Sequence, residues 1–184
     1  PTASPADPLA ELIAVGRDIF APHIADPDVA AFWWPRFERV AHWFAENDPL
    51  MRDGVGRIAT EAKGRIDFTL AGETYTLTAR ADRIDLKSGA ARIVDYKTGA
   101  AITAKDVEAG LSPQLTLEAA ILSAGGFKGL PAIDTGELIY MYLSGGEPAG
   151  EIKAAGAKDS NPMTLAANHL DGLKRLLLAY SNPA

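Results

Sequence analysis

The feature that most constrains this chain is an apolar run that ends in two charged residues, Arg-Ile-Val-Asp-Tyr-Lys at 92–97. Side chains alternate between the faces of a strand, so Asp95 and Lys97 point to one side while Tyr96 points to the other. With Asp82 thirteen positions upstream, these residues fit a site for a hard divalent cation. The competing interpretation is a surface ion pair at a strand end, which Asp-x-Lys alone favours.

Composition narrows the possible classes of protein. The 184 residues, 47% of them hydrophobic, predict a single domain over 9–184, preceded by a linker or chain edge at 1–8. No apolar run is long enough to span a bilayer, and the N-terminus does not resemble a signal peptide. The absence of cysteine excludes disulfides, thiolate zinc sites and iron–sulfur clusters. A cytoplasmic origin is therefore expected.

Charge is distributed unevenly along the chain. The formal net charge is −6, which argues against nucleic acid as a partner. Residues 51–105, however, carry 10 basic and 7 acidic side chains, whereas residues 1–50 carry 3 and 8. A globally acidic protein can thus present one locally basic face, and the stretch that contains Asp82 and Asp95 is the basic one.

Hydrophobic periodicity predicts helices and strands in the order αβββαβ, followed by a last helix. The predicted helices span 9–20, 35–47, 113–124 and 162–180. The predicted strands span 57–70, 74–86, 91–97 and 137–143, with 148–154 as a further candidate. The second helix is rich in aromatic residues, which more often form a core or an interface than a surface for stacking bases. This order predicts an α/β fold with a mixed β-sheet flanked by helices.

Three segments in this order resemble a known family. They are Ala-Asp-Arg-Ile-Asp at 81–85, Ile-Val-Asp-Tyr-Lys-Thr-Gly at 93–99 and Pro-Gln-Leu-Thr-Leu at 113–117. Together they resemble the RecB-like branch of the PD-(D/E)xK nucleases, with the C-terminal nuclease domain of the double-strand break repair protein AddB the most similar. The resemblance covers roughly residues 30–180. It implies a restriction-endonuclease-like fold and a Mg²⁺- or Mn²⁺-dependent deoxyribonuclease of the exonuclease type.

The resemblance also implies roles for individual residues. Asp82 and Asp95 would be metal ligands, with the backbone carbonyl of Tyr96 a further one. Lys97 would orient the attacking water and stabilise developing charge, and Gln114 would lie near the scissile phosphate or near Lys97. These four side chains and one backbone carbonyl complete the implied site.

Two other acidic residues, Asp85 and Glu61, could in principle also belong to the metal site. Asp85 is an odd number of positions from Asp82, so only one of them can share the face of Asp95. We expect Asp85 to pair with Arg83, Lys87 or Arg92 near the surface, and its replacement to leave the chemistry unchanged. Glu61, on the first strand, is an additional candidate metal ligand or an ordinary solvent-facing residue.

The chain departs from the family pattern in three places. No Gly-x-x-x-His element is present, since His23, His42 and His169 all stand in other contexts. Glu118 stands four residues after Gln114, where many relatives have Tyr. The cysteines that ligate an iron–sulfur cluster in some AddB proteins are absent. We therefore expect a C-terminal fragment of a larger helicase–nuclease subunit, held together by packing alone.

The expected partners are DNA, an AddA-type helicase–nuclease subunit and the remainder of an AddB chain. No association with a membrane is expected. One alternative is a stand-alone, Cas4-like exonuclease of the same fold. A second alternative is a catalytically silent DNA-binding or scaffold domain, which intact acidic residues and Lys97 disfavour. The chain lacks a phosphate-binding loop for ATP, so it is not the motor.

Overall fold

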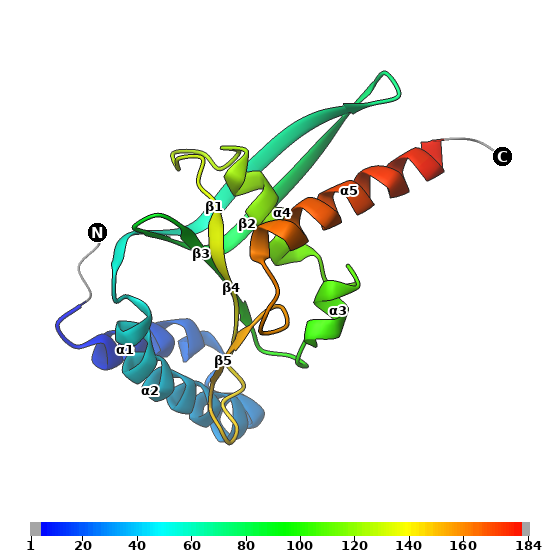
Figure 1. The fold of residues 1–184 in the computed structure, drawn as a ribbon. Coiled ribbons are helices and arrows are strands. Elements are labelled where there is room, and N and C mark those ends of the chain that lie inside the picture. The colour runs from blue at the N-terminus through cyan, green and yellow to red at the C-terminus, as the bar shows by residue number, and fades with distance from the viewer. Residues whose placement is uncertain (1–4, 182–184) are drawn as a thin grey trace. The chain divides into compact units, whose positions relative to one another are not determined.

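A computed structural model describes residues 5–181 (Figure 1), so the predicted linker at 1–8 lies partly outside the described residues. The helices are α1 (Pro8–Phe20), α2 (Trp34–Met51), α3 (Ala104–Glu108), α4 (Gln114–Ser123) and α5 (Pro162–Ser181). The strands are β1 (Val55–Leu70), β2 (Glu73–Lys87), β3 (Ala91–Lys97), β4 (Thr135–Tyr142) and β5 (Glu151–Ala154). A 3₁₀ turn (Ala21–His23) and a π-helical segment (Val29–Trp33) precede α2.

The five strands form one sheet in the order β1-β2-β3-β4-β5. β1 pairs with β2 and β2 with β3 in antiparallel fashion. Between β3 and β4, the Ala91 amide donates to the Asp134 carbonyl and the Leu143 amide donates to the Lys97 carbonyl, each at 2.8 Å. Both bonds advance in the same chain direction, as in a parallel pair joined by a helical crossover. The predicted mixed α/β sheet with helices is confirmed.

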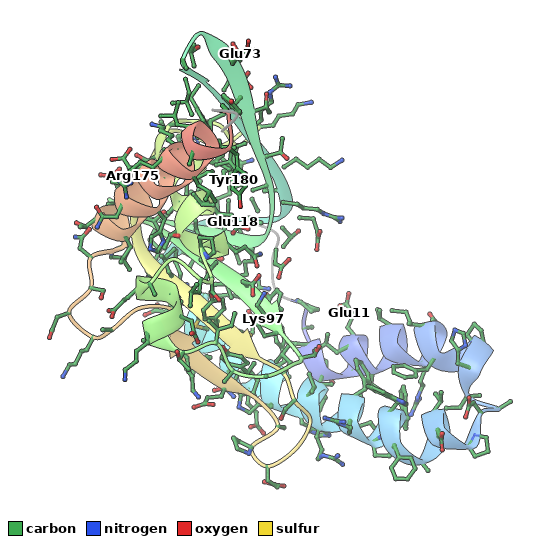
Figure 2. The ribbon with its side chains drawn as sticks, turned by 90° about the vertical axis from the view of Figure 1, so that its right-hand side faces the viewer. Glu11, Glu73, Lys97, Glu118, Arg175 and Tyr180 are labelled. Carbon is green, nitrogen blue, oxygen red and sulfur yellow. The ribbon has the colours of Figure 1, made fainter. Side chains whose placement is uncertain are left out.

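β1 and β2 form a long hairpin that extends beyond α4 in Figure 1. Its two-residue loop is Ala71-Gly72, with φ of 49° and 87°. Positive φ at both loop positions is the I′ geometry that matches strand twist, and Gly72 adopts it without steric cost. The turn therefore fixes the register at Leu70 opposite Glu73. Glu73 marks this tip in Figure 2.

The chain divides into two compact units. The first comprises residues 1–54, 96–100 and 141–152, and is built around the pair α1 and α2. The rings of Phe20, Trp34 and Phe37 lie 5.6–5.7 Å apart between their centroids. Gly16 faces Phe37 so closely that a Cβ there would lie 2.1 Å from the ring. Phe20, Trp34 and Phe37 are thus half-buried against one another, whereas Phe32 and Trp33 are exposed.

The second unit comprises residues 55–95, 101–140 and 153–184. Its centre is α4, whose Leu115, Ala119 and Leu122 are fully buried against neighbouring elements that include α5, β1 and β2. Gly64 of β1 allows a close approach, since a Cβ there would lie 2.8 Å from both Ile121 and Phe127. α5 reaches the hairpin through the Tyr75 hydroxyl and the Ser181 hydroxyl, whose oxygens are 2.6 Å apart.

The π-helical segment, α3 and the end of α2 differ from the sequence predictions. The sequence pattern does not reveal α3, a single short helix whose Thr103 and Asp106 form a reciprocal capping box. α2 runs on to Met51 through Pro49, four residues past the predicted end. Among residues 5–181, no helix combines the length and the apolar character that a membrane span requires.

Candidate functional site

The register of β2 and β3 determines where Asp82 and Asp95 lie. The pairs run from Leu86 opposite Ala91 to Arg83 opposite Val94. One further step of the same register sets Asp82 opposite Asp95, and residues directly opposite in an antiparallel pair share a face. Asp95 is 2% exposed and Asp82 is half-buried. The register therefore gives the two carboxylates a common face, and their role as metal ligands stays a prediction.

The start of α4 brings an amide to this position. Gln114, the first residue of α4, donates through Nε2 to Asp95 Oδ1 at 2.7 Å. The same Nε2 lies 3.3 Å from Glu118 Oε1, one helical turn along α4. Because the nitrogen of the amide is directed at two carboxylates, its Oε1 points away from both. The sequence-predicted Gln114 and Asp95 are thus in direct contact.

Glu118 is the site residue that the sequence analysis missed. It is 2% exposed, although glutamate is rarely buried without a partner. Its partner here includes Gln114, which stands at the i−4 position on the same helical face. The signal available in the sequence was its position four residues after Gln114, where it reads only as a departure from the family pattern.

Lys97 and Tyr96 end β3 and belong to the first unit. The Lys97 carbonyl accepts from the Leu143 amide at 2.8 Å, which fixes the backbone at the strand end, and the Lys97 side chain is half-buried (labelled in Figure 2). The ring of Tyr96 packs against Phe44 with centroids 6.3 Å apart. The Tyr96 side chain thus packs within the first unit, and the role of its carbonyl as a metal ligand stays a prediction.

Glu61 occupies an unusual position on β1. It lies between Thr60 and Ala62, whose register partners are Arg83 and Ala81, so it falls across from Asp82. Its φ is 52°, in the left-handed region that non-glycine residues rarely adopt. Its carboxylate pairs with the Arg80 guanidinium, and 56% of its side chain is exposed. Its role as a further metal ligand stays a prediction.

Asp85 does not lie near the surface, and that expectation is wrong. Its side chain is fully buried between two arginines: Arg83 Nε lies 2.7 Å from Oδ1, and Arg92 Nη2 lies 2.5 Å from Oδ2. The predicted partners Arg83 and Arg92 are correct, and both are themselves almost fully buried. The physical reason is that the carboxylate is desolvated together with two guanidinium groups that donate charge-assisted hydrogen bonds to it.

The donor set suits a hard cation. Asp82, Asp95 and Glu118 offer carboxylate oxygens, Gln114 offers an amide oxygen, and the chain has no thiolate. Oxygen donors are those that Mg²⁺ and Mn²⁺ prefer. Within residues 5–181, no group of three or more His, Asp or Glu side chains is placed to hold a metal ion. The types of donor present therefore suit Mg²⁺ or Mn²⁺ with further ligands from water and substrate phosphate, and the metal site itself stays a prediction.

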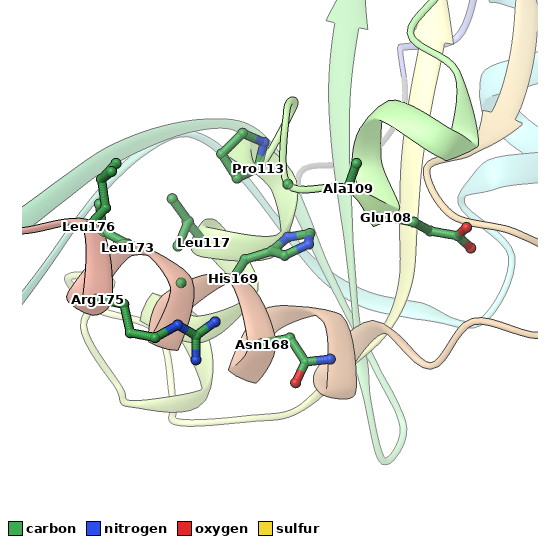
Figure 3. A pocket seen from close by; sticks show the side chains of 11 residues that line it. Glu108, Ala109, Pro113, Leu117, Asn168, His169, Leu173, Arg175 and Leu176 are labelled. Carbon is green, nitrogen blue, oxygen red and sulfur yellow. The ribbon is translucent and has the colours of Figure 1, made fainter. Parts of the chain in front are cut away.

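A separate cavity of about 450 Å³ lies between α4 and α5 (Figure 3). His169 of α5 enters it, and its Nδ1 lies 2.6 Å from the Thr116 hydroxyl. That hydroxyl donates to the Pro113 carbonyl at 2.8 Å, so Nδ1 carries the proton in the bond with Thr116. His169 thus braces the first turn of α4, directly beside Gln114, rather than contacting Asp95.

Comparison with known proteins identifies similar sequences. The sequence model of the PD-(D/E)XK nuclease superfamily matches residues 6–182. An uncharacterized protein of Rickettsia bellii is 29% identical over 184 residues, which cover 92% of this chain and 22% of that protein. The uncharacterized protein RT0391 of Rickettsia typhi is 32% identical over 140 residues, covering 74% and 16%. The chain thus spans about a fifth of the length of these curated relatives.

Among solved structures, the crystal structure of SSO0001 has a TM-score of 0.40 and 14% sequence identity. The match covers 92% of this chain and 74% of that one.

Proposed function

This chain belongs to the PD-(D/E)XK nuclease superfamily, and we propose that it hydrolyses DNA phosphodiesters with a divalent cation held by Asp82 and Asp95. Membership implies a nuclease of the phosphodiester hydrolase class. The single observation that carries the specific proposal is the contact at 2.7 Å between Gln114 of α4 and Asp95 of β3. It joins two separately predicted site residues from distant parts of the sequence.

The side chains divide the work as follows. Asp95 and Asp82, on one face of neighbouring strands, supply oxygen ligands, and the Tyr96 carbonyl can add another. When bound, the cation lowers the pKa of a coordinated water and acts as a Lewis acid. Gln114 holds Asp95 in one orientation and directs its own Oε1 away from the two carboxylates. Lys97 contributes a cation to orient the attacking water and to stabilise charge that develops on the phosphate.

Mg²⁺ or Mn²⁺ is the proposed cofactor. Zn²⁺ prefers nitrogen and sulfur ligands, which this donor set does not offer, whereas oxygen donors in an open arrangement suit magnesium. Calorimetry with each metal, combined with cleavage in each metal, tests this assignment. We expect weak magnesium or manganese binding and cleavage in both. Tight zinc binding without any effect of magnesium or manganese on cleavage would overturn it.

The larger context is also a proposal. The matched relatives are between four and five times as long as this chain, which agrees with a nuclease domain inside a larger subunit. We propose an AddAB-type helicase–nuclease that resects double-strand breaks, with an AddA-type subunit as partner. Purification of the longer protein with its partner, followed by a DNA-unwinding assay with ATP, tests this. Unaided cleavage by the domain, with no ATP-driven partner, would favour the stand-alone exonuclease.

The catalytically silent scaffold is the second candidate. What favours it is the burial of Asp95 and Glu118, each 2% exposed, with both carboxylates already accepting from Gln114 Nε2. The test is direct: linear DNA is incubated with the protein and Mg²⁺, with Asp95→Ala as the matched control. Cleavage by the wild type alone supports the nuclease. DNA binding without cleavage by either protein supports the scaffold.

A further inference from the structure

A row of three cations crosses the β1–β2 hairpin next to the candidate site. Lys63 of β1 stands directly opposite Arg80 of β2. On the other side of β1, Gly64 bridges to Phe127, and the Lys128 amide donates to the Lys63 carbonyl at 3.2 Å. One step of this bridge register sets Lys128 opposite Lys63. Lys128, Lys63 and Arg80 therefore lie side by side on one face.

Three like charges directly opposite each other need a physical reason, because such pairs destabilise a sheet. The side chains of Arg80 and Arg65 are 64% and 63% exposed, and Lys63 and Lys128 are also exposed. Glu61 partly compensates Arg80, and Asp67 partly compensates Arg65. Lys63 and Lys128 have no acidic partner anywhere in the part of the chain that the structure describes. An unbalanced, solvated pair of ammonium groups thus remains.

These cations line one groove. A depression of about 570 Å³ is bounded by Lys63, Arg65, Arg80 and Lys128, with the backbone of Gly64 and Gly126 among its walls. Gly126 packs closely on β1 beside this groove, since a Cβ there would lie 2.5 Å from the Arg65 carbonyl oxygen. The residues that line the groove include no aromatic ring, and its charged groups suit phosphate.

The groove lies in line with the candidate site. Arg80 and Asp82 are two residues apart on β2, so their side chains leave the strand on the same face. A strand rises about 3.3 Å per residue, so the cation row at Arg80 lies about 7 Å along β2 from Asp82. Arg65 stands opposite Thr78, which lies about 13 Å along β2 from Asp82. With DNA rising about 3.4 Å per nucleotide along each strand, this spacing spans two to four nucleotides.

We propose that this groove is a phosphate-binding exosite, which holds the DNA backbone two to four nucleotides from the phosphate cleaved at Asp82 and Asp95. The proposal rests on the nuclease function proposed above and deepens it. Lys63 and Lys128 contact phosphate oxygens through charge, Arg65 and Arg80 through guanidinium hydrogen bonds. The contacts carry no sequence information, because phosphates alone are bound.

Charge reversal tests this directly. DNA affinity is measured by fluorescence anisotropy in EDTA, which prevents cleavage, over a series of salt concentrations for two unrelated duplexes. We expect Lys63→Glu with Lys128→Glu to weaken binding equally for both sequences and to make the log K against log salt slope shallower by about two. Lys63→Gln with Lys128→Gln should weaken binding less. Lys158→Glu, an exposed lysine elsewhere in the same unit, is the matched control and should bind as wild type.

The two proposals fail separately. Unchanged affinity and slope in the double glutamate variant, or an equal loss in Lys158→Glu, would overturn the exosite whether or not the protein cleaves DNA. Circular dichroism melts of all variants exclude unfolding as the cause. A wild type that binds DNA in the expected way but never cleaves it with Mg²⁺ would contradict the nuclease function and leave the exosite standing.

Discussion

Gln114 Nε2 lies 2.7 Å from Asp95 Oδ1, so the first residue of α4 is tied to the end of β3. The two residues are nineteen positions apart in sequence, and α3 with its flanking loops lies between them. The bond matters because a metal-ligating carboxylate is oriented by its outer hydrogen bonds. Glu118 Oε1 accepts from the same Nε2 at 3.3 Å, so the amide nitrogen is held between two carboxylates.

We predict that Gln114→Ala lowers both metal affinity and cleavage by about 10–100-fold, the usual effect of losing an outer-shell partner. Glu118→Ala should lower both by a smaller factor, because one acceptor for the amide remains. Glu118→Gln keeps an acceptor oxygen and should recover part of the loss. Manganese binding followed by electron paramagnetic resonance gives the affinity independently of cleavage. Full activity and affinity in Gln114→Ala would contradict this role.

Asp85→Ala is expected to destabilise the protein strongly. The substitution leaves Arg83 and Arg92 buried without their shared carboxylate, and breaking a buried ion pair from one side typically costs about 3–5 kcal/mol. Urea unfolding gives the free energy of unfolding. Asp67→Ala, which removes the acid of the exposed pair with Arg65, is the matched control and should change little. Equal free energies of unfolding for the two variants would show that the buried ion pairs of Asp85 contribute no more to stability than the exposed pair.

The capping box of α3 predicts a pH dependence. The Thr103 hydroxyl and then the Thr103 amide donate to the Asp106 carboxylate and lower the pKa of Asp106 below its ordinary value of 3.8. Because the folded pKa is the lower one, this stabilisation is present above pH 3.8 and is lost as the pH falls through the folded pKa. The difference in Tm between wild type and Asp106→Ala should therefore shrink in acid. A difference in Tm that stays constant from neutral to acid pH would contradict it.

The strand periodicity was enough to place the sheet. Asp95 and Lys97 end a strand as expected, and the pairing of β2 with β3 follows from the turn at Ser88-Gly89. The π-helical segment and α3 could not be predicted, since one turn of helix has too few residues for a periodic signal. The prediction that Asp85 lies near the surface also failed. Strand alternation tells which face a side chain points to, but not whether other elements cover that face.

Glu118 shows a second limit of sequence reasoning. A single sequence shows which residue stands one turn after Gln114, but not that the side chain is buried or that both contact one amide. The cation row on the hairpin was equally hidden. Lys63 is beside Arg80 through the pairing of β1 with β2. Lys128 is beside Lys63 only through an isolated bridge between Gly64 and Phe127, outside the named strands.

The central claim is that Asp95 and Lys97 carry out metal-dependent phosphodiester hydrolysis. The most direct measurement compares Mg²⁺-dependent cleavage of linear DNA by wild type, Lys97→Ala and Asp95→Ala, with DNA affinity and the melting curve recorded for each. We expect Lys97→Ala to lose about 10²–10³ in rate while fold and affinity stay near wild type, because Lys97 stabilises charge that develops only in the transition state. Asp95→Ala should lose at least as much. Equal cleavage by wild type and Lys97→Ala would contradict the claim.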